Sequence, residues 1–327
     1  MSKANRILMT GVGAYLPERI VTNDELSGWV DTSDEWIKQR TGIEQRHMVA
    51  EGELTSDLAY NAAIQALAHA KLQPEQIDVI VIATTTPDDT FPSTASKVQQ
   101  RLGAKQAFAF DVQAVCAGFV YALTVAESLL IAQKGTKALV IGAESFTKLL
   151  DWEDRGTCVL FGDGAGAVIL EAEEAPADFG ILASKLHTDG AFRDILYVDG
   201  GPSATGDVGH VRMEGQEVFR HAVEKLSSVM DEVLKDADVA AEAVDWLVPH
   251  QANIRIINGM QRKLRLPADR VVRTVHKHAN TSAASIPLAL SEAVHDGRIT
   301  DGDLLALEAI GGGLAWGASL VRFGRPS

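Results

Sequence analysis

Residues 107–131, AFAFDVQAVCAGFVYALTVAESLLI, join a strand pattern to a helix pattern through a short turn of small residues. The run from Ala107 to Val112 predicts a strand, and the pattern from Phe119 to Ile131 predicts a helix. Cys116 lies in the turn, directly before the helix. Unpaired N–H groups and the positive end of a helix dipole favour thiolate over thiol there, so the sequence predicts a nucleophilic cysteine. A small buried core cysteine is the alternative.

Composition bounds the class of protein. The chain has 327 residues, 46% of them hydrophobic and 23% charged, which suits one large α/β unit or two domains. Two cysteines without a CxxC pair favour a reducing cytoplasm. No signal-peptide pattern opens the chain, and no apolar run reaches the about 18 residues that span a membrane. The net charge of −14 argues against nonspecific nucleic-acid binding.

Strand and helix patterns alternate along the chain, with short Gly, Asp and Pro segments between them, which is typical of an α/β protein. Buried strands are predicted at residues 77–83, 137–142, 165–170, 244–248 and 304–308. Helices are predicted at residues 56–70, 119–133, 215–235 and 285–295.

An internal repeat appears when the chain is compared with itself at one constant shift. This repeat shift places Asp78 on Asp245, Val81 on Val248, Ala122-Leu123 on Ala289-Leu290, and Gly135 on Gly302. The matched order of elements indicates duplication, with halves at residues 1–174 and 175–327. Similar halves packed together place their loops at a shared centre. Cys116 of the first half is therefore expected to meet His250 and Asn280 of the second.

His250 and Asn280 would complete an acyl-transfer site. His250 follows the predicted strand 244–248, the usual location of catalytic groups in α/β sheets, although a structural histidine is the alternative. Asn280 lies in a polar loop before Ser285, where a helix cap or a turn is the alternative. Thiolate, imidazole and amide would supply one nucleophile and two hydrogen-bond donors for a developing oxyanion.

Glycine-rich segments add one candidate and exclude others. Gly311-Gly312-Gly313 would let the backbone approach a reacting group, although a hairpin or bulge is the alternative. Residues 11–13 lack the third glycine of a dinucleotide fingerprint, and residues 162–166 precede a strand, so neither predicts a phosphate site. The sequence also lacks a GxSxG elbow and a His/Cys cluster at zinc spacing, so no metal site is expected.

Eight ordered segments together resemble β-ketoacyl-acyl carrier protein synthase III, essentially end to end. They are residues 31–37 (DTSDEWI), 40–43 (RTGI), 114–119 (AVCAGF), 154–157 (DRGT), 161–166 (FGDGAG), 249–253 (PHQAN), 280–285 (NTSAAS) and 311–317 (GGGLAWG). The resemblance implies an α/β thiolase-like fold, with two duplicated αβ halves in a five-layered αβαβα arrangement, and a homodimer.

The resemblance implies a decarboxylating Claisen condensation that initiates fatty acid synthesis. Cys116 would take a short acyl group such as acetyl from acyl-CoA, while the N–H groups of Cys116 and Gly312 hold the thioester oxygen. Malonyl-acyl carrier protein (malonyl-ACP) would then lose CO₂, and His250 and Asn280 would stabilise the enolate that attacks the acyl-cysteine. Decarboxylation supplies the carbanion, so neither a metal nor a redox cofactor is expected.

The resemblance also implies two binding surfaces. Trp36 and Arg155 would sandwich the CoA adenine, with Thr32, Arg40, Gly215, Ala252 and Asn253 nearby. A surface aromatic among solvated charges is the alternative. The acidic carrier protein would dock on a basic island that holds Arg220, Gln251, Arg255, Arg262 and Lys263. Arg255 and Arg262 are seven residues apart, on one helix face, and a solvated face is the alternative.

The expected acyl pocket holds Phe91, Phe146 and Ile310. Phe91 matches the residue that family dimers insert from the partner subunit, and its bulk suggests short primers. Phe146 and Ile310 stand where the family usually has a smaller apolar residue and an aromatic, and Ala279 stands where glycine is common. Because these three residues depart from the family pattern, the sequence defines the accepted acyl chain less well than it defines the type of reaction.

Rival functions differ at specific residues. A degradative thiolase needs a second catalytic cysteine near the C-terminal glycines, and Cys158 lies far from them. An elongating synthase pairs two histidines, and Asn280 replaces the second. Two rivals stay open: a secondary-metabolite condensing or acyl-transfer enzyme with the same triad, and a non-catalytic scaffold that binds acyl thioesters.

Overall fold

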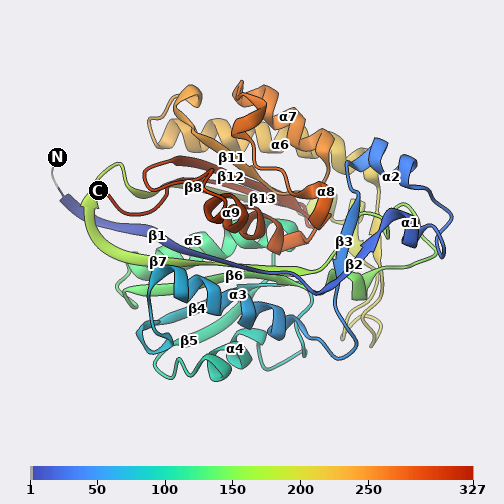
Figure 1. Ribbon diagram of the computed structural model, residues 1–327, viewed down its shortest axis with the longest axis horizontal. Coiled ribbons are helices and arrows are strands. Elements are labelled where there is room, and N and C mark those ends of the chain that lie inside the picture. Colours follow the sequence, from blue (N-terminus) through green and yellow to red (C-terminus); the bar gives the residue numbers. More distant parts are fainter. Residues whose placement is uncertain (1–2, 327) are drawn as a thin grey trace.

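Two stacked β-sheets organise the computed structural model, which describes residues 3–326 (Figure 1). The first sheet has the order β1 (Lys3–Tyr15), β7 (Gly164–Pro176), β6 (Lys137–Glu144), β4 (Val79–Ala83) and β5 (Phe108–Val112). The second has the order β11 (Trp246–Pro249), β12 (Leu304–Gly311), β13 (Ala315–Arg322) and β8 (Gly180–Thr188). Two small sheets pair β2 (Arg19–Thr22) with β3 (Gln45–Met48) and β9 (Leu196–Val198) with β10 (Val211–Met213).

Helices fill three layers around these sheets, which makes the five-layered αβαβα arrangement (Figure 1). The outer layer on the first sheet has α3 (Thr55–Ala70) and α4 (Thr94–Leu102). The middle layer, between the sheets, has α5 (Gly118–Ile131) and α9 (Ser285–His295). The outer layer on the second sheet has α6 (Gly215–Asp236) and α7 (Ile254–Leu264). Shorter helices are α1 (Asn23–Leu26), α2 (Asp34–Thr41) and α8 (Val275–His278). The fold class implied by the resemblance is confirmed.

Short 3₁₀ turns connect these elements: η1 (Pro74–Gln76), η2 (Val115–Ala117), η3 (Phe146–Leu149), η4 (Gly190–Ile195), η5 (Ala241–Ala243), η6 (Ala268–Arg270) and η7 (Ser282–Ala284). Of the described helices, none is both long and apolar enough to traverse a bilayer.

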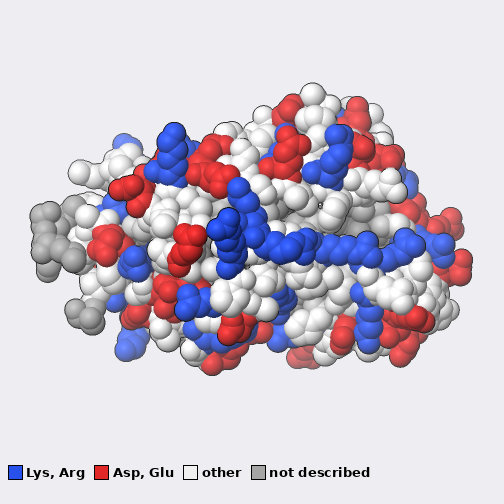
Figure 2. All heavy atoms as spheres, turned by 90° about the horizontal axis from the view of Figure 1, so that it is seen from above, with Lys and Arg blue, Asp and Glu red and all other residues white. Residues whose placement is uncertain are grey.

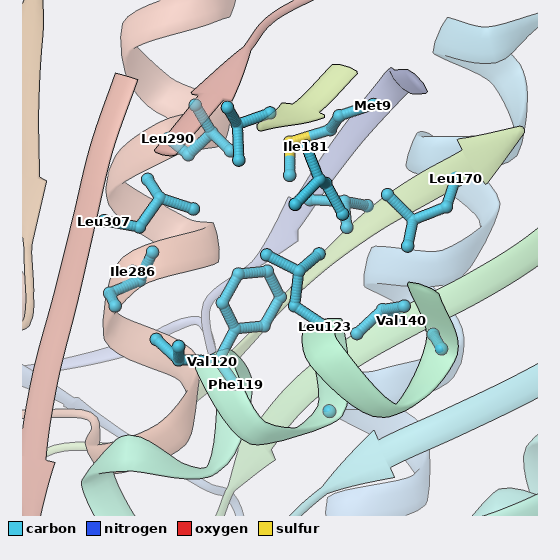
Figure 3. Packing of buried hydrophobic residues seen from close by; sticks show 14 of the residues in the cluster. Met9, Phe119, Val120, Leu123, Val140, Leu170, Ile181, Ile286, Leu290 and Leu307 are labelled. Atoms are coloured by element: carbon cyan, nitrogen blue, oxygen red, sulfur yellow. The ribbon is translucent and has the colours of Figure 1, made fainter. Parts of the chain in front are cut away.

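The central strands β4, β6 and β12 are buried on both faces, and this explains their uninterrupted apolar runs. In β6, Val140 belongs to the core around the middle helices, whereas Ile141 belongs to the core beneath α3. Figure 3 shows the middle layer, where Phe119 of α5 and Ile286 of α9 lie between the two sheets. Such a strand has no polar face, so its sequence shows no alternation.

The duplication is visible in the elements themselves. The repeat shift carries the bounds of β6, residues 137–144, onto those of β12, residues 304–311. It also carries the first residue of α5 onto the first residue of α9. At the turns before these helices it carries Val115, with φ 49°, onto Ser282, with φ 50°. The chain passes from the first sheet to the second between Pro176 and Gly180, a few residues after the predicted division.

Glycines of the segment 162–166 have a packing role. A Cβ at Gly166 would lie 2.5 Å from the backbone of Pro287 and Leu288, so its absence lets β7 approach α9. Asp163 in the same segment accepts hydrogen bonds from Thr147 and from Val49 N. This segment is therefore a structural element of the interface between the halves.

Replacing Gly166 by alanine is expected to destabilise the fold by about 1–3 kcal/mol, because the methyl group would overlap helix backbone that cannot swing away. The measurement is the thermal midpoint of unfolding. Gly190→Ala is the matched control, because a Cβ there meets nothing within 4 Å. Equal midpoints for the two variants would contradict this account of Gly166.

Candidate active site

Cys116 lies at a strained elbow between β5 and α5. Val115, directly before it, has a φ of 49°, a conformation that costs a β-branched residue roughly 1–3 kcal/mol. The end of β12 presses against the elbow, since a Cβ at Gly311 would lie 2.6 Å from the backbone nitrogen of Cys116. Gly311 also ends the first strand of the β12–β13 hairpin, so the hairpin alternative and the close approach both hold.

One cavity of about 660 Å³ joins the predicted residues, within the range typical of small-molecule sites. Cys116, His250 and Asn280 all line it, and all three are buried. The convergence that the duplication predicted is therefore present in the structure. The exposed residues at the same cavity, which mark its mouth, include Arg40, Arg155 and Arg255.

His250 is held as a neutral hydrogen-bond donor. It follows β11, and its backbone N–H donates to Glu308 O at 2.8 Å. Its Nδ1 lies 2.5 Å from Ser285 Oγ, which also accepts from Gln251 N. Ser285 can donate its single proton to Nδ1, and in that arrangement the ring proton lies on Nε2. Burial lowers the pKa of His250 to about 3, so the ring is uncharged at neutral pH.

Asn280 is oriented by the backbone around it. Its side-chain Oδ1 accepts from Ser282 N at 2.9 Å, and its own N–H donates to Leu160 O at 2.9 Å. The turn that the alternative interpretation predicted is thus real. The same contact fixes the amide, and within residues 3–326 its Nδ2 has no partner, so it remains a donor for a ligand in the cavity.

Burial opposes the thiolate that the sequence predicts for Cys116. The side chain lies at a helix start, as expected, but it is only 4% exposed. Burial raises the pKa of this thiol to about 12, and the hydroxyl of Ser282 lowers it against that effect. Desolvation of the anion acts against the helix N-terminus here.

The mouth of the cavity carries a cluster of aromatic and guanidinium groups. The guanidinium of Arg40 lies 4.5 Å from the ring centroid of Trp36, and that of Arg155 lies 5.3 Å from it. A planar ring stacked between Trp36 and Arg155 would need about 7 Å between them, because each of its two stacking contacts takes about 3.5 Å. Arg155 also donates to Asp31 O. A ligand ring between Trp36 and Arg155 would therefore require Arg155 to swing outward.

A basic band crosses the face above the second sheet. Figure 2 shows Lys and Arg side chains running from the middle of this face toward the end at which α2 lies in Figure 1. α7 supplies the exposed Arg255, Arg262 and Lys263. It joins α2 through hydrogen bonds from Asn253 Nδ2 to Arg40 O and from Arg255 to Gln39 O.

Two family descriptions match the chain: "3-Oxoacyl-[acyl-carrier-protein (ACP)] synthase III" over residues 110–190, and its C-terminal counterpart over residues 234–323. The chain is 60% identical over 320 residues to the β-ketoacyl-[acyl-carrier-protein] synthase III of Paramagnetospirillum magneticum, covering 97% of this chain and 99% of that protein. The chain belongs to the β-ketoacyl-acyl carrier protein synthase III family.

Solved structures agree with this assignment. The synthase resembles the 3-oxoacyl-[acyl-carrier-protein] synthase III of Aquifex aeolicus with a TM-score of 0.92 and 46% identity, over 98% of this chain and 100% of that one. It also resembles the priming β-ketosynthase of the R1128 polyketide biosynthetic pathway, with a TM-score of 0.93 and 32% identity, over 100% of this chain and 99% of that one.

Most residues that the resemblance implied for CoA line the cavity of the synthase. They are Trp36, Arg40, Arg155, Gly215, Ala252 and Asn253. Asn253 also caps α7, where its side chain accepts from Arg255 N at 2.8 Å. Thr32 does not line the cavity, and its Oγ1 is buried without a partner among the described residues.

Gln251 was expected to contact the carrier protein, and its burial contradicts this. The side chain has an exposed fraction of 0%. Its Nε2 donates to Pro249 O and Val272 O, and its Oε1 accepts from Thr274 N and Val275 N. Every hydrogen-bonding group is satisfied inside the protein, so Gln251 holds the loops behind His250 in place. Arg220 is exposed, but it pairs with Glu217.

Apart from Phe91, the pocket and oxyanion residues line two neighbouring cavities, and Phe146 belongs to both. Phe146 and Ile310 line the cavity of Cys116, where Phe146 stacks on Phe161 at 4.3 Å between ring centroids. Gly312 lines a neighbouring cavity of about 910 Å³. Phe91 lines neither and is 82% exposed. A single chain therefore leaves Phe91 outside its own acyl pocket.

Three polar residues near the centre were not predicted from the sequence: Glu144, Ser282 and Ser285. Both serines stand in the quoted segment 280–285, which was the available signal. Glu144 ends a buried strand, and nothing in its sequence setting distinguishes it. No three His, Cys, Asp or Glu side chains are grouped to hold a metal ion anywhere in residues 3–326.

The protonation state of Cys116 can be checked by ultraviolet titration of the thiolate, taken as the difference between wild type and Cys116→Ala. We expect no Cys116 thiolate absorbance below about pH 10, because two units below a pKa only about 1% of the group is ionised. A thiolate signal with a midpoint near neutral pH would show that the helix N-terminus prevails over burial.

Proposed function

We propose that this synthase condenses a short acyl-CoA with malonyl-ACP through an acyl-Cys116 intermediate, releasing CO₂ and giving 3-ketoacyl-ACP. The observation that carries the proposal is the shared cavity of Cys116, His250 and Asn280, in which one nucleophile and two oriented donors line the same space. This is the initiating condensation of fatty acid synthesis, the activity to which the family name refers.

In the first half-reaction, Cys116 Sγ attacks the thioester carbon and CoA leaves. The backbone N–H of Cys116 lies at the elbow, where the close approach of Gly311 brings the glycine segment beside it. We assign the thioester oxygen to the N–H groups of Cys116 and Gly312. Donors fixed by backbone need no reorganisation as charge develops, and this stabilises the tetrahedral intermediate.

In the second half-reaction, malonyl-ACP loses CO₂ and the electron pair of the broken bond becomes an enolate. His250 Nε2–H and Asn280 Nδ2 donate to the enolate oxygen. A neutral imidazole suits this role, because it donates without adding a charge to a desolvated site. The enolate carbon then attacks acyl-Cys116. The bonds and electrons balance without a redox cofactor or a metal, so we propose none.

The acyl group would lie beside the stacked Phe146 and Phe161 and against Ile310. The bulk of these lining side chains supports acetyl as the primer. The exposed Phe91 supports a homodimer in which each subunit adds this residue to the partner's pocket. The cytoplasmic location stays a prediction.

The cavity mouth supports CoA recognition. Trp36 offers a stacking face, and Arg40 and Arg155 offer cationic planes close to its ring. The backbone at Gly215 and the α7 start at Ala252 and Asn253 would flank the pantetheine arm. The basic band then meets the acidic carrier protein when malonyl-ACP replaces CoA.

A secondary-metabolite condensing enzyme remains the alternative, because the priming β-ketosynthase of a polyketide pathway has the same fold at 32% identity. The higher identities, 60% and 46%, are with proteins named for synthase III itself. This difference favours primary fatty acid synthesis over the polyketide alternative. The non-catalytic scaffold is disfavoured, because the nucleophile and both donors are in place.

Single-turnover mass spectrometry of the intact protein tests the reaction. We expect wild type, but not Cys116→Ala, to gain an acetyl group from acetyl-CoA and to lose it to malonyl-ACP as acetoacetyl-ACP. His250→Ala and Asn280→Ala are expected to acetylate but to discharge about 100-fold more slowly, the usual cost of one oxyanion donor. Acetylation that malonyl-ACP cannot discharge would favour the polyketide-type alternative.

Carrier-protein docking is tested with Arg262→Glu. Arg262 is exposed on α7 and has no ion pair among the described residues, so reversing its charge removes one contact and adds a repulsion. We expect the KM for malonyl-ACP to rise about tenfold, with unchanged acetylation by acetyl-CoA. Lys134→Glu, the same charge change at an exposed site beyond the end of α5, is the control. Equal effects of the two variants would contradict a docking site on α7.

A further inference from the structure

The synthase contains a buried carboxyl that the two half-reactions do not use. Glu144, at the end of β6, has an exposed fraction of 0%. Its carboxylate accepts from Thr85 N, Thr85 Oγ1 and Thr86 Oγ1 at 2.8–3.2 Å. A carboxyl that is fully removed from water yet supplied with several donors can exist in either protonation state.

Ser282 stands between this carboxyl and the nucleophile. Its turn, η7, contacts both η2, which carries Cys116, and β6, which carries Glu144. The fit is tight, because a Cβ at Gly142 of β6 would lie 2.2 Å from Ala283 O. The Ser282 hydroxyl is buried and has no hydrogen bond of standard geometry with the described residues. It is therefore free to turn toward either neighbour.

The duplication explains why these groups meet. The repeat shift carries the Cys116 elbow at Val115 onto the second elbow at Ser282, and it carries Glu144 onto Gly311. Each strand end thus approaches the elbow of the opposite half. Gly311 presses on Cys116, and in the equivalent place Glu144 faces Ser282.

We propose that Glu144 accepts the proton of the Cys116 thiol through the Ser282 hydroxyl during acylation and returns it after condensation. The proposal rests on the acyl-Cys116 reaction given above. Glu144 and Ser282 act through Cys116 and touch no substrate, so they are proton-relay residues.

The proton and electron balance closes over the cycle. In acylation, the S–H pair forms the new S–C bond, the proton passes through Ser282 to Glu144, and CoA leaves as a thiolate that takes a proton from water. In condensation, the enolate carbon attacks acyl-Cys116 and the S–C pair returns to sulfur. The protonated Glu144 then gives its proton back through Ser282 and restores the thiol.

The ionisation of the neighbouring groups supports this assignment. Burial raises the pKa of Glu144 to about 7 and that of Cys116 to about 12, and the Ser282 hydroxyl lowers both against burial. His250 is a poor base, because burial lowers its pKa to about 3. A general base works best when its pKa is near the operating pH, and Glu144 meets that condition.

The surroundings of Glu144 contain few other ionisable groups. The loop Thr84–Thr86 brings only hydroxyls and amides. On the neighbouring elements, Asp163 before β7 is held by Thr147 and Val49, and His250 after β11 is held by Ser285. Cys116 is the group whose pKa responds to the charge of Glu144.

The test measures single-turnover acetylation of full-length protein by acetyl-CoA from acidic to alkaline pH, by rapid quench and intact mass. Wild type should accelerate with pH and level off above about pH 7, as Glu144 ionises. Glu144→Gln keeps the shape of the side chain but cannot accept the proton. The acetylation rate above pH 7 should therefore fall about 100-fold, and the inflection of the pH profile near pH 7 should vanish. Ser282→Ala should do the same, and the double variant should be no slower than either single variant.

Two controls separate a relay from a structural role. Glu127→Gln alters another carboxyl, on α5, whose pKa burial raises to about 7 but which lines neither cavity, and it should keep the wild-type profile. Decarboxylation of malonyl-ACP without primer needs only the donors, so it should be unchanged in Glu144→Gln and Ser282→Ala.

Three outcomes would overturn the relay: a wild-type pH profile in Glu144→Gln, additive effects of the two substitutions, or an equal loss of decarboxylation and acetylation. Failure of wild type itself to acquire an acyl group would instead refute the proposed reaction. The two failures are therefore distinct.

Discussion

The enclosure of the first turns of α5 and α9 between two sheets is the constraint on which the rest of the structure depends. Every residue from Ser285 to Ser291 is buried, as are Gly118, Phe119 and Val120 at the start of α5. Helices without a solvent face must pack against backbone, and Gly166 and Gly311 provide the close approaches that this requires. The two helices begin at equivalent positions of the repeat. Cys116, before α5, and Ser285, which contacts His250 at the start of α9, are therefore brought to one cavity.

The same enclosure sets the ionisation of the site. Water is removed from Cys116, His250 and Glu144 alike, and burial favours the neutral form of each. It raises the pKa of Cys116 and Glu144 and lowers the pKa of His250. For His250 this produces an uncharged donor, which suits a developing oxyanion. For Cys116 it produces a thiol that needs a base at the moment of attack. Local hydrogen bonds then decide how far each group departs from its ordinary behaviour.

The features that could be predicted from the sequence are those where a residue type and its setting leave few alternatives. The uninterrupted apolar strands, the helix at residues 285–295 and the constant repeat shift all appear in the fold, because periodicity and duplication are properties of the chain itself. The ordered motifs were sufficient to indicate the family. The family pattern also marked Ala279 as a departure, and its backbone, with φ 58 and ψ -159, lies where glycine is normally required.

What the sequence by itself determined is the order of the elements, their duplication and the choice of Cys116, His250 and Asn280 as the candidate nucleophile and its two candidate partners. Tertiary structure alone decided the burial of Gln251, the protonation of Cys116 and the meeting of Glu144 with Ser282. A side chain's exposure and pKa depend on atoms far away in the chain, which no local pattern records. Glu144 and Ser282 belong to opposite halves of the chain, and only the stacking of one half on the other makes them neighbours.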